Sequence, residues 1–185
     1  MKFLLIPATF LLAAEAFINF DFRAAGCTQR EKAKVEQCIH PFIMKLGETR
    51  NKIASSTITR EQGTQIVDVC RESQECFKTV GCSKQLEAEK KARVFCDAGE
   101  FLFSDYFDCM KKLKQSKSEC ISSVKLADIM KAKGESGCNA FRTLTRCFKK
   151  ETLRVCSDVE WRGMRAHIGR FAQLINADCD LRAVL

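Results

Sequence analysis

Zinc-type and redox-type cysteine motifs are missing from this 185-residue sequence, although it holds twelve cysteines. No two of them have the Cys-x-x-Cys spacing that is typical of structural zinc sites and of thioredoxin-like redox sites. Histidine is scarce as well, and neither His40 nor His167 has a cysteine at a usual ligand spacing. We therefore expect no metal and no cofactor, and we expect the cysteines to form disulfides.

Long apolar runs are also rare, and the one that is present lies at the N-terminus. Residues 3–14 are largely apolar and follow the positive start Met1-Lys2, while Ala14-Glu15-Ala16 matches the small-x-small pattern of signal cleavage. This run is shorter than the roughly 20 residues that a membrane-spanning helix needs. The sequence therefore predicts a signal peptide over residues 1–16, a secreted extracellular protein, and no membrane span.

Proline is almost absent, since only Pro7 and Pro41 occur, so no residue after Pro41 interrupts a helix by its missing N–H. Apolar residues recur at helical spacing. Four segments match the capping box, namely Thr28-x-x-Glu31, Thr59-x-x-Gln62, Ser116-x-x-Glu119 and Ser157-x-x-Glu160. We predict an all-α fold of about six or seven helices, with a kink or a split at Pro41 and a loop over 47–58. The predicted helices cover residues 29–46, 60–80, 84–96, 100–115, 117–133, 138–155 and 158–176.

The cysteines are confined to the part of the chain that follows a mature N-terminal leader over residues 17–26, for which flexible and docked states both stay open. We expect residues 27–185 to form a single cysteine-rich helical domain with six disulfides. The spacing does not choose among the possible pairings. The cysteines expected to pair are Cys27, Cys38, Cys70, Cys76, Cys82, Cys96, Cys109, Cys120, Cys138, Cys147, Cys156 and Cys179.

Three of these cysteines sit in similar settings, namely Cys76-Phe-Lys, Cys109-Met-Lys and Cys147-Phe-Lys. Together with the signal-like start, the Cys27-Thr28 pair and the cysteine-punctuated helical body, they resemble the nematode secreted family catalogued as domain of unknown function nineteen. The resemblance covers roughly residues 27–179. It implies an extracellular, disulfide-rich, α-helical protein without an established activity, and it assigns no functional residue beyond the cysteines.

Catalytic motifs are not found. The sequence has no Gly-x-Ser-x-Gly elbow, no His-Glu-x-x-His helix and no phosphate-binding glycine loop. Asp105 and Asp108 share a helix face at a spacing of three, but such pairs are far more often solvated surface charges than glycosidase carboxylates. We therefore predict no catalytic residue and no enzyme.

Positive charge is in excess, with 31 Lys and Arg against 23 Asp and Glu and a net charge of +8. The excess can serve solubility alone, or it can attract anionic glycans, lipid headgroups or acidic proteins. Nucleic acid is disfavoured by the predicted compartment. The candidate basic binding patch consists of Lys111, Lys112, Lys149, Lys150, Arg154, Arg162, Arg165 and Arg170.

Aromatic residues are dense between Phe101 and Phe107, where they form either part of the core or the lining of an apolar pocket.

The leading hypothesis for the function is a non-catalytic extracellular binding module for a protein or an anionic glycan. The alternative is a carrier of lipid or another small hydrophobe, with a pocket between helices near the Phe101–Phe107 segment. A membrane-active protein is a third hypothesis and requires an exposed apolar face.

Overall fold

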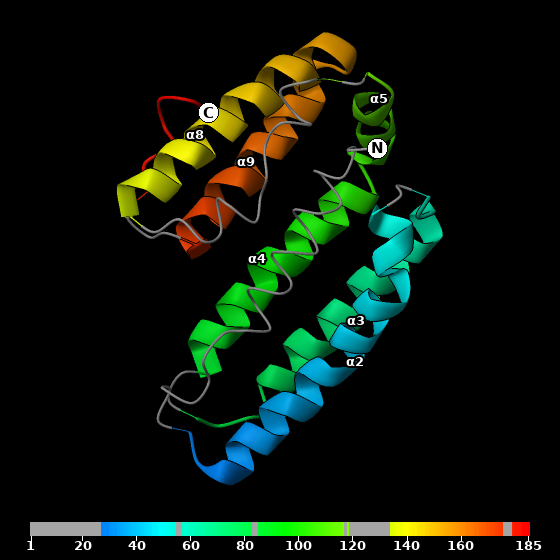
Figure 1. The fold of residues 1–185 in the computed structure, drawn as a ribbon. Coiled ribbons are helices and arrows are strands. Elements are labelled where there is room, and N and C mark those ends of the chain that lie inside the picture. The colour runs from blue at the N-terminus through cyan, green and yellow to red at the C-terminus, as the bar shows by residue number, and fades with distance from the viewer. Residues whose placement is uncertain (1–26, 55–56, 83–84, 117, 119–133, 176–178) are drawn as a thin grey trace.

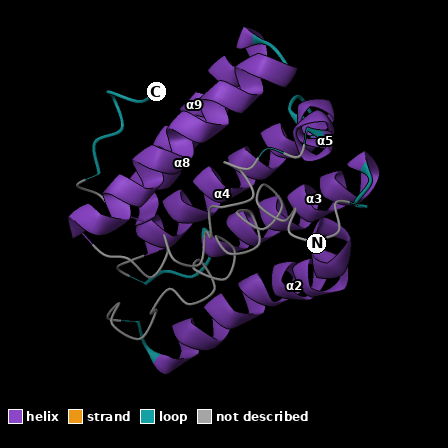
Figure 2. Cartoon of the chain, turned by 45° about the horizontal axis from the view of Figure 1, so that its top comes forward, coloured by secondary structure: helices purple, strands orange, loops and turns teal. Residues whose placement is uncertain are grey.

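The computed structural model describes residues 27–54, 57–82, 85–116, 118, 134–175 and 179–185, and over these residues it is helical without any strand (Figures 1 and 2). The predicted all-α fold is confirmed. The predicted signal peptide, the 17–26 leader, the predicted 117–133 helix apart from Ser118, and Cys120 lie outside the described residues. The helices are α2 (Gln29–Ala54), α3 (Arg60–Phe77), α4 (Gln85–Phe103), α5 (Phe107–Gln115), α8 (Gly134–Val155) and α9 (Asp158–Ile175).

The long helices lie side by side in the order α2, α3, α4, α9, α8, so that α4 is central (Figure 1). The short helix α5 follows α4 and packs against α8. None of the described helices combines the length and the apolar character needed to cross a bilayer.

Two of the four predicted capping boxes form, at the N-termini of α2 and α3. At α9 the Ser157 hydroxyl instead donates to the Glu160 side chain, and Glu119 lies outside the described residues. The Thr28 backbone N–H donates to Glu31 Oε2 at 2.6 Å, and the Glu31 N–H donates back to Thr28 Oγ1 at 3.3 Å. Thr59 and Gln62 exchange the equivalent bonds at 3.2 Å each. These bonds satisfy backbone donors that the first turn of a helix leaves unpaired.

Helix α2 is longer than the sequence predicts. It continues through Pro41 and Gly47 to Ala54, so the split considered at Pro41 does not occur and the predicted loop is wrong over residues 47–54. Two features explain the continuation. Phe42 and Leu46 keep the buried stripe at helical spacing, and the Thr49 hydroxyl donates to the Lys45 carbonyl at 2.8 Å.

Disulfides divide the described chain into two halves. Three of them, Cys27–Cys82, Cys38–Cys76 and Cys70–Cys96, lie in the N-terminal half, which we define as residues 27–103. Two others, Cys109–Cys156 and Cys138–Cys179, lie in the C-terminal half, residues 104–185. Cys147 is also disulfide-bonded. None of the five pairs joins one half to the other.

The end of α4 packs against one helix of each half, and its contact with α9 joins the halves. The ring of Phe103 lies against Gly63 of α3, and the ring of Phe101 lies against Gly163 of α9, so closely that a Cβ at either glycine would overlap the ring. Phe101 also stacks on His167 with ring centroids 4.7 Å apart. This helix therefore runs past the break predicted between residues 96 and 100, because its last turn carries the two rings that fill these notches.

Candidate functional site

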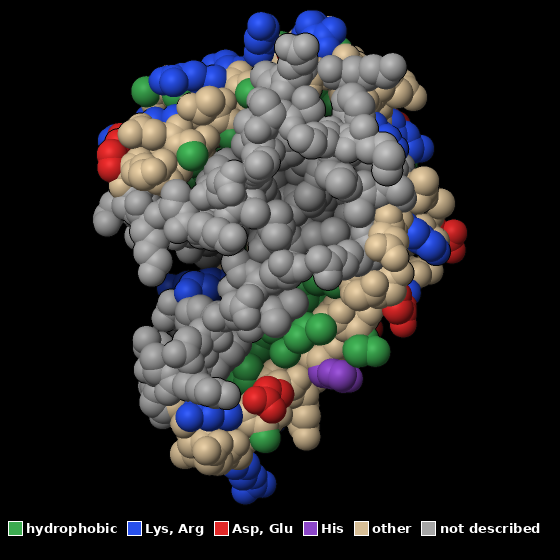
Figure 3. All heavy atoms as spheres, in the orientation of Figure 1, with side chains coloured by type: hydrophobic (Ala, Val, Ile, Leu, Met, Phe, Trp, Pro, Cys, Tyr) green, Lys and Arg blue, Asp and Glu red, His purple; other side chains and the backbone are tan. Residues whose placement is uncertain are grey.

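Charge is distributed unevenly between the two halves. Residues 27–103 hold 13 Lys and Arg against 11 Asp and Glu, whereas residues 104–185 hold 16 against 10. Most of the net charge of +8 therefore belongs to the C-terminal half. Figure 3 shows Lys and Arg side chains along the upper rim, where Figure 1 places α8 and α9.

Two contacts bring α5 to the turn between α8 and α9. The Cys109–Cys156 disulfide joins α5 to the residue that follows α8. Beside it, the buried hydroxyls of Tyr106 and Thr152 share a hydrogen bond of 2.7 Å. Lysines of α5 are therefore placed at the same end of the molecule as the cations of α8 and α9 (Figure 1).

We call this region the basic end. It unites seven of the eight residues of the candidate patch, which come from separate parts of the sequence, and it adds Arg146, which shares the exposed face of α8 with Lys150. Its members are Lys111 and Lys112 of α5, Arg146, Lys149, Lys150 and Arg154 of α8, and Arg162 and Arg165 of α9.

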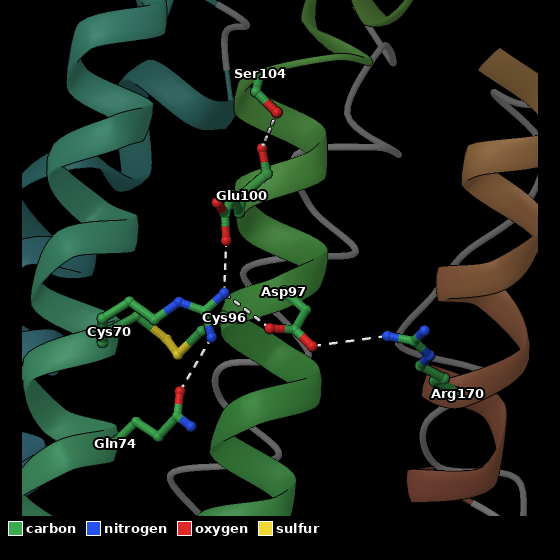
Figure 4. Close-up of polar contacts among 8 residues, drawn as sticks. Cys70, Gln74, Cys96, Asp97, Glu100, Ser104 and Arg170 are labelled. Atoms are coloured by element: carbon green, nitrogen blue, oxygen red, sulfur yellow. Dashed lines mark hydrogen bonds and ion pairs between the residues drawn. A yellow bond between two sulfur atoms is a disulfide. The ribbon is translucent and has the colours of Figure 1, made fainter. Parts of the chain in front are cut away.

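The eighth candidate, Arg170, lies elsewhere. Its Nη1 is 3.6 Å from Asp97 Oδ2 of α4, and the other oxygen of Asp97 is 2.8 Å from Nη2 of Arg71 on α3 (Figure 4). This carboxylate thus connects α3, α4 and α9. Arg170 serves the junction of the two halves and is not part of the basic end.

Several cations of the basic end already have a partner inside the protein. Arg154 holds Glu151 at 2.6 Å, and Arg162 holds Asp158 at 3.2 Å. Lys111 lies over the Phe107 ring, 4.5 Å from its centroid, and Lys149 lies 5.7 Å from the centroid of Trp161. These contacts neutralise or orient part of the positive charge.

Three other cations are open to solvent. Arg146, Lys150 and Arg165 are exposed, and within the described part of the chain their side chains form no ion pair or hydrogen bond. They come from the outer faces of two packed helices, so their backbone positions are set by the fold while their charges face outward. Such cations are available to an external anion without breaking an internal contact.

Exposed apolar side chains also occur at this end, and they were not predicted from the sequence. Leu153 is 44% exposed and Val159 is 67% exposed, on either side of the α8–α9 turn. Met44 of α2 is the third large apolar residue with high exposure among the described residues, at 52%. The sequence does carry a signal for Val159, because it lies outside the stripe that Trp161 and Met164 form on α9.

The aromatic side chains of the Phe101–Phe107 segment belong to the hydrophobic core. Phe103, Tyr106 and Phe107 are buried. Phe101 packs against the rings of Tyr106 and His167, as well as against Gly163. These side chains contact protein groups on several helices, which is the behaviour of core residues.

Two of the titratable groups named from the sequence, Asp108 and His167, are engaged in structural contacts, whereas Asp105 and His40 are exposed. Asp108 pairs with Arg60 at 3.1 Å. Burial lowers the pKa of the stacked His167, and the nearby Arg170 lowers it further. Within the described residues, no group of three or more His, Cys, Asp or Glu side chains could hold a metal ion.

Comparison with known proteins places this disulfide-rich helical body in a family. Residues 27–180 match the family model described as Domain of unknown function (DUF19), which is more than half of the chain. The chain belongs to the DUF19 family. The resemblance inferred from its cysteines and helices is therefore confirmed, and all five described disulfides lie within the matched DUF19 region.

A relative of this DUF19 chain is known from a nematode. It is the Caenorhabditis elegans protein named UPF0376 protein F10G2.1, which is 25% identical over 177 residues, or 88% of this chain and 86% of the relative. No solved structure matches the chain.

Proposed function

We propose that this DUF19 protein is a secreted, non-catalytic binding module whose basic end recognises an anionic glycan. The observation that carries the proposal is the set of exposed cations, Arg146, Lys150 and Arg165, which have no counterion within the described residues. A sulfated or carboxylated glycan presents many anionic groups along one chain, and it can therefore contact cations of two adjacent helices at once.

The proposed compartment rests on two features. The N-terminal sequence has the pattern of a signal peptide, and the described cysteines are all bonded. Disulfides in this number are typical of proteins that function in an oxidising environment. The proposed absence of catalysis rests on the engagement of His167 and Asp108 in packing and ion pairing.

The lipid-carrier alternative receives less support. It needs the Phe101–Phe107 segment to line a pocket, but these rings contact Gly63, Gly163 and His167. An acidic protein surface remains the second class of partner for the basic end, and the competition experiment below distinguishes it from a glycan.

The proposal is tested by the salt concentration at which the oxidised protein elutes from immobilised heparin. We expect the double variant Lys150→Gln with Arg165→Gln to elute at clearly lower salt than the unmodified protein. The matched control is Arg30→Gln with Lys90→Gln, which also removes one exposed Lys and one exposed Arg without a partner in the described residues, but from the N-terminal half. Equal shifts for the two pairs would show that retention follows net charge and would overturn the proposal.

Competition with free oligosaccharides identifies the class of polyanion. Sulfated oligosaccharides should release the protein from the column at concentrations where an acidic polypeptide of equal charge does not. If the polypeptide competes equally well, the basic end recognises negative charge in general, and the assignment to a glycan is wrong.

A further inference from the structure

The exposed apolar side chains at the basic end have no matching apolar group on a glycan. Leu153 lies in the last turn of α8 and Val159 lies in the first turn of α9, so the short Cys156–Ser157 connection places both at one tip of the molecule. They are 44% and 67% exposed. We call them the apolar pair.

Cations lie close to the apolar pair along both helices, and the nearby carboxylates are bonded within the protein. Lys150 and Arg154 flank Leu153 in sequence on the exposed face of α8, and Arg162 lies one turn after Val159. The carboxylates are bound within the protein, since the 8% exposed side chain of Glu151 is held by Arg154, Asp158 is held by Arg162, and Glu160 accepts a bond from the Ser157 hydroxyl. The tip thus exposes apolar groups and at least one free positive charge together.

The tip is also rigidly held. The Cys109–Cys156 disulfide ties the turn to α5, and Tyr106 bonds to Thr152 in the last turn of α8. A surface that is already ordered loses little conformational entropy when it binds, so even a small contact can contribute to affinity.

We propose that the basic end docks on an anionic lipid surface, with the apolar pair entering the boundary between headgroups and acyl chains. This goes beyond the proposed glycan binding, because it assigns a role to Leu153 and Val159 that a glycan cannot fill. A lipid surface offers anionic phosphates for the cations and an apolar layer immediately beneath them.

Other occupants fit the tip less well. A stable protein partner buries roughly 800 Å² on each side, which is far more than two aliphatic side chains supply. A glycan supplies anionic groups but no apolar phase. The combination of few apolar groups and several cations matches reversible attachment at a membrane surface, where neither signal is sufficient alone.

The test is sedimentation of the oxidised protein with vesicles of phosphatidylcholine alone or of phosphatidylcholine mixed with phosphatidylserine. We expect binding to the mixed vesicles and much weaker binding to the neutral ones. The double variant Leu153→Ser with Val159→Ser should weaken binding to the mixed vesicles by about tenfold or more. Val159→Ser alone is the second variant, because its side chain is mostly exposed and its loss should leave folding intact.

Met44→Ser is the matched control, since it removes an exposed apolar side chain from α2 in the other half. Unchanged vesicle binding by the apolar-pair variants, or an equal loss with Met44→Ser, would overturn the proposal. Failure to bind mixed vesicles while heparin is still retained would overturn it as well, and would leave the glycan proposal standing. Loss of heparin binding in Lys150→Gln with Arg165→Gln, but not in the apolar-pair variants, would separate the two functions.

Discussion

The two halves of the molecule use the same kind of helix and the same kind of cross-link, but they differ in charge and in what they expose. The N-terminal half is nearly neutral and holds three described disulfides: one joins α2 to α3, one joins α3 to α4, and Cys27–Cys82 joins the residues before α2 to the α3–α4 connection. In the C-terminal half one disulfide ties the basic end together, and another anchors the tail at Cys179. This comparison indicates that the N-terminal half is mainly a scaffold, whereas the C-terminal half carries the basic end on its surface.

Side-chain packing and ion pairs hold the two halves together at their junction, whereas disulfides cross-link each half internally. At the junction, Phe101 fits the notch at Gly163, and Asp97 lies between Arg71 and Arg170. None of the described disulfides crosses it. Changes at the junction should therefore affect the whole fold, whereas changes in one half should affect that half first.

Removing a disulfide from each half gives the largest expected effect. Cys109→Ser with Cys156→Ser and Cys38→Ser with Cys76→Ser should each lower the free energy of unfolding by about 2–5 kcal/mol, because each loss frees the unfolded chain. Only the first pair should also reduce heparin retention, since it releases α5 from the α8–α9 turn. Urea unfolding and heparin elution of the two variants check this. Equal heparin retention by the two variants would contradict the inference that the Cys109–Cys156 disulfide holds the basic end together.

Two glycine substitutions should have opposite effects on stability. Gly163→Ala places a Cβ against the Phe101 ring and should destabilise the protein by about 1–3 kcal/mol. Gly47→Ala meets nothing within 4 Å on α2 and should stabilise it by up to about 1 kcal/mol, because alanine favours the helix. Urea midpoints measure both. A stabilising Gly163→Ala would show that the close junction does not exist.

Acid should weaken the junction through His167. Burial and Arg170 lower the pKa of this imidazole, whereas Asp97 raises it. The folded state therefore binds the proton less readily than the unfolded chain. The contribution to stability is complete above the ordinary histidine pKa of about 6.5 and is lost as the pH falls through the lower folded pKa.

The effect should be modest, because the imidazole is only half-buried. His167→Gln removes the titrating group, so the stability difference between neutral and mildly acidic buffer should be smaller in the variant than in the unmodified protein. Urea unfolding at the two pH values measures this difference. An identical pH dependence in both proteins would exclude His167 as its source.

Helical character could be predicted from the sequence because it has a local cause. The capping boxes at Thr28 and Thr59 and the buried stripe through Phe42 are encoded within a few residues. The continuation of α2 through Gly47 could not be predicted in the same way. Glycine can end a helix, and here the packing of Leu46 keeps the helix going.

The basic end could be predicted only in part. Its lysines and arginines are visible as clusters in the sequence, but their union depends on the Cys109–Cys156 pairing, which cysteine spacing does not encode. The same limit explains Arg170. It follows Arg162 and Arg165 at helical spacing, yet the placement of α4 beside α9 gives it Asp97 as a partner. Tertiary contacts, not local pattern, decide which cations stay free.

Lysine footprinting in the presence of a heparin oligosaccharide tests whether the basic end is the binding surface. Acetylation of each lysine would be quantified by mass spectrometry with and without the oligosaccharide. We expect protection of Lys111, Lys112 and Lys150 at the basic end and unchanged labelling of Lys90 in the N-terminal half. Protection of Lys90 to the same degree, or labelling of Lys150 that does not change, would contradict the assignment of binding to the basic end.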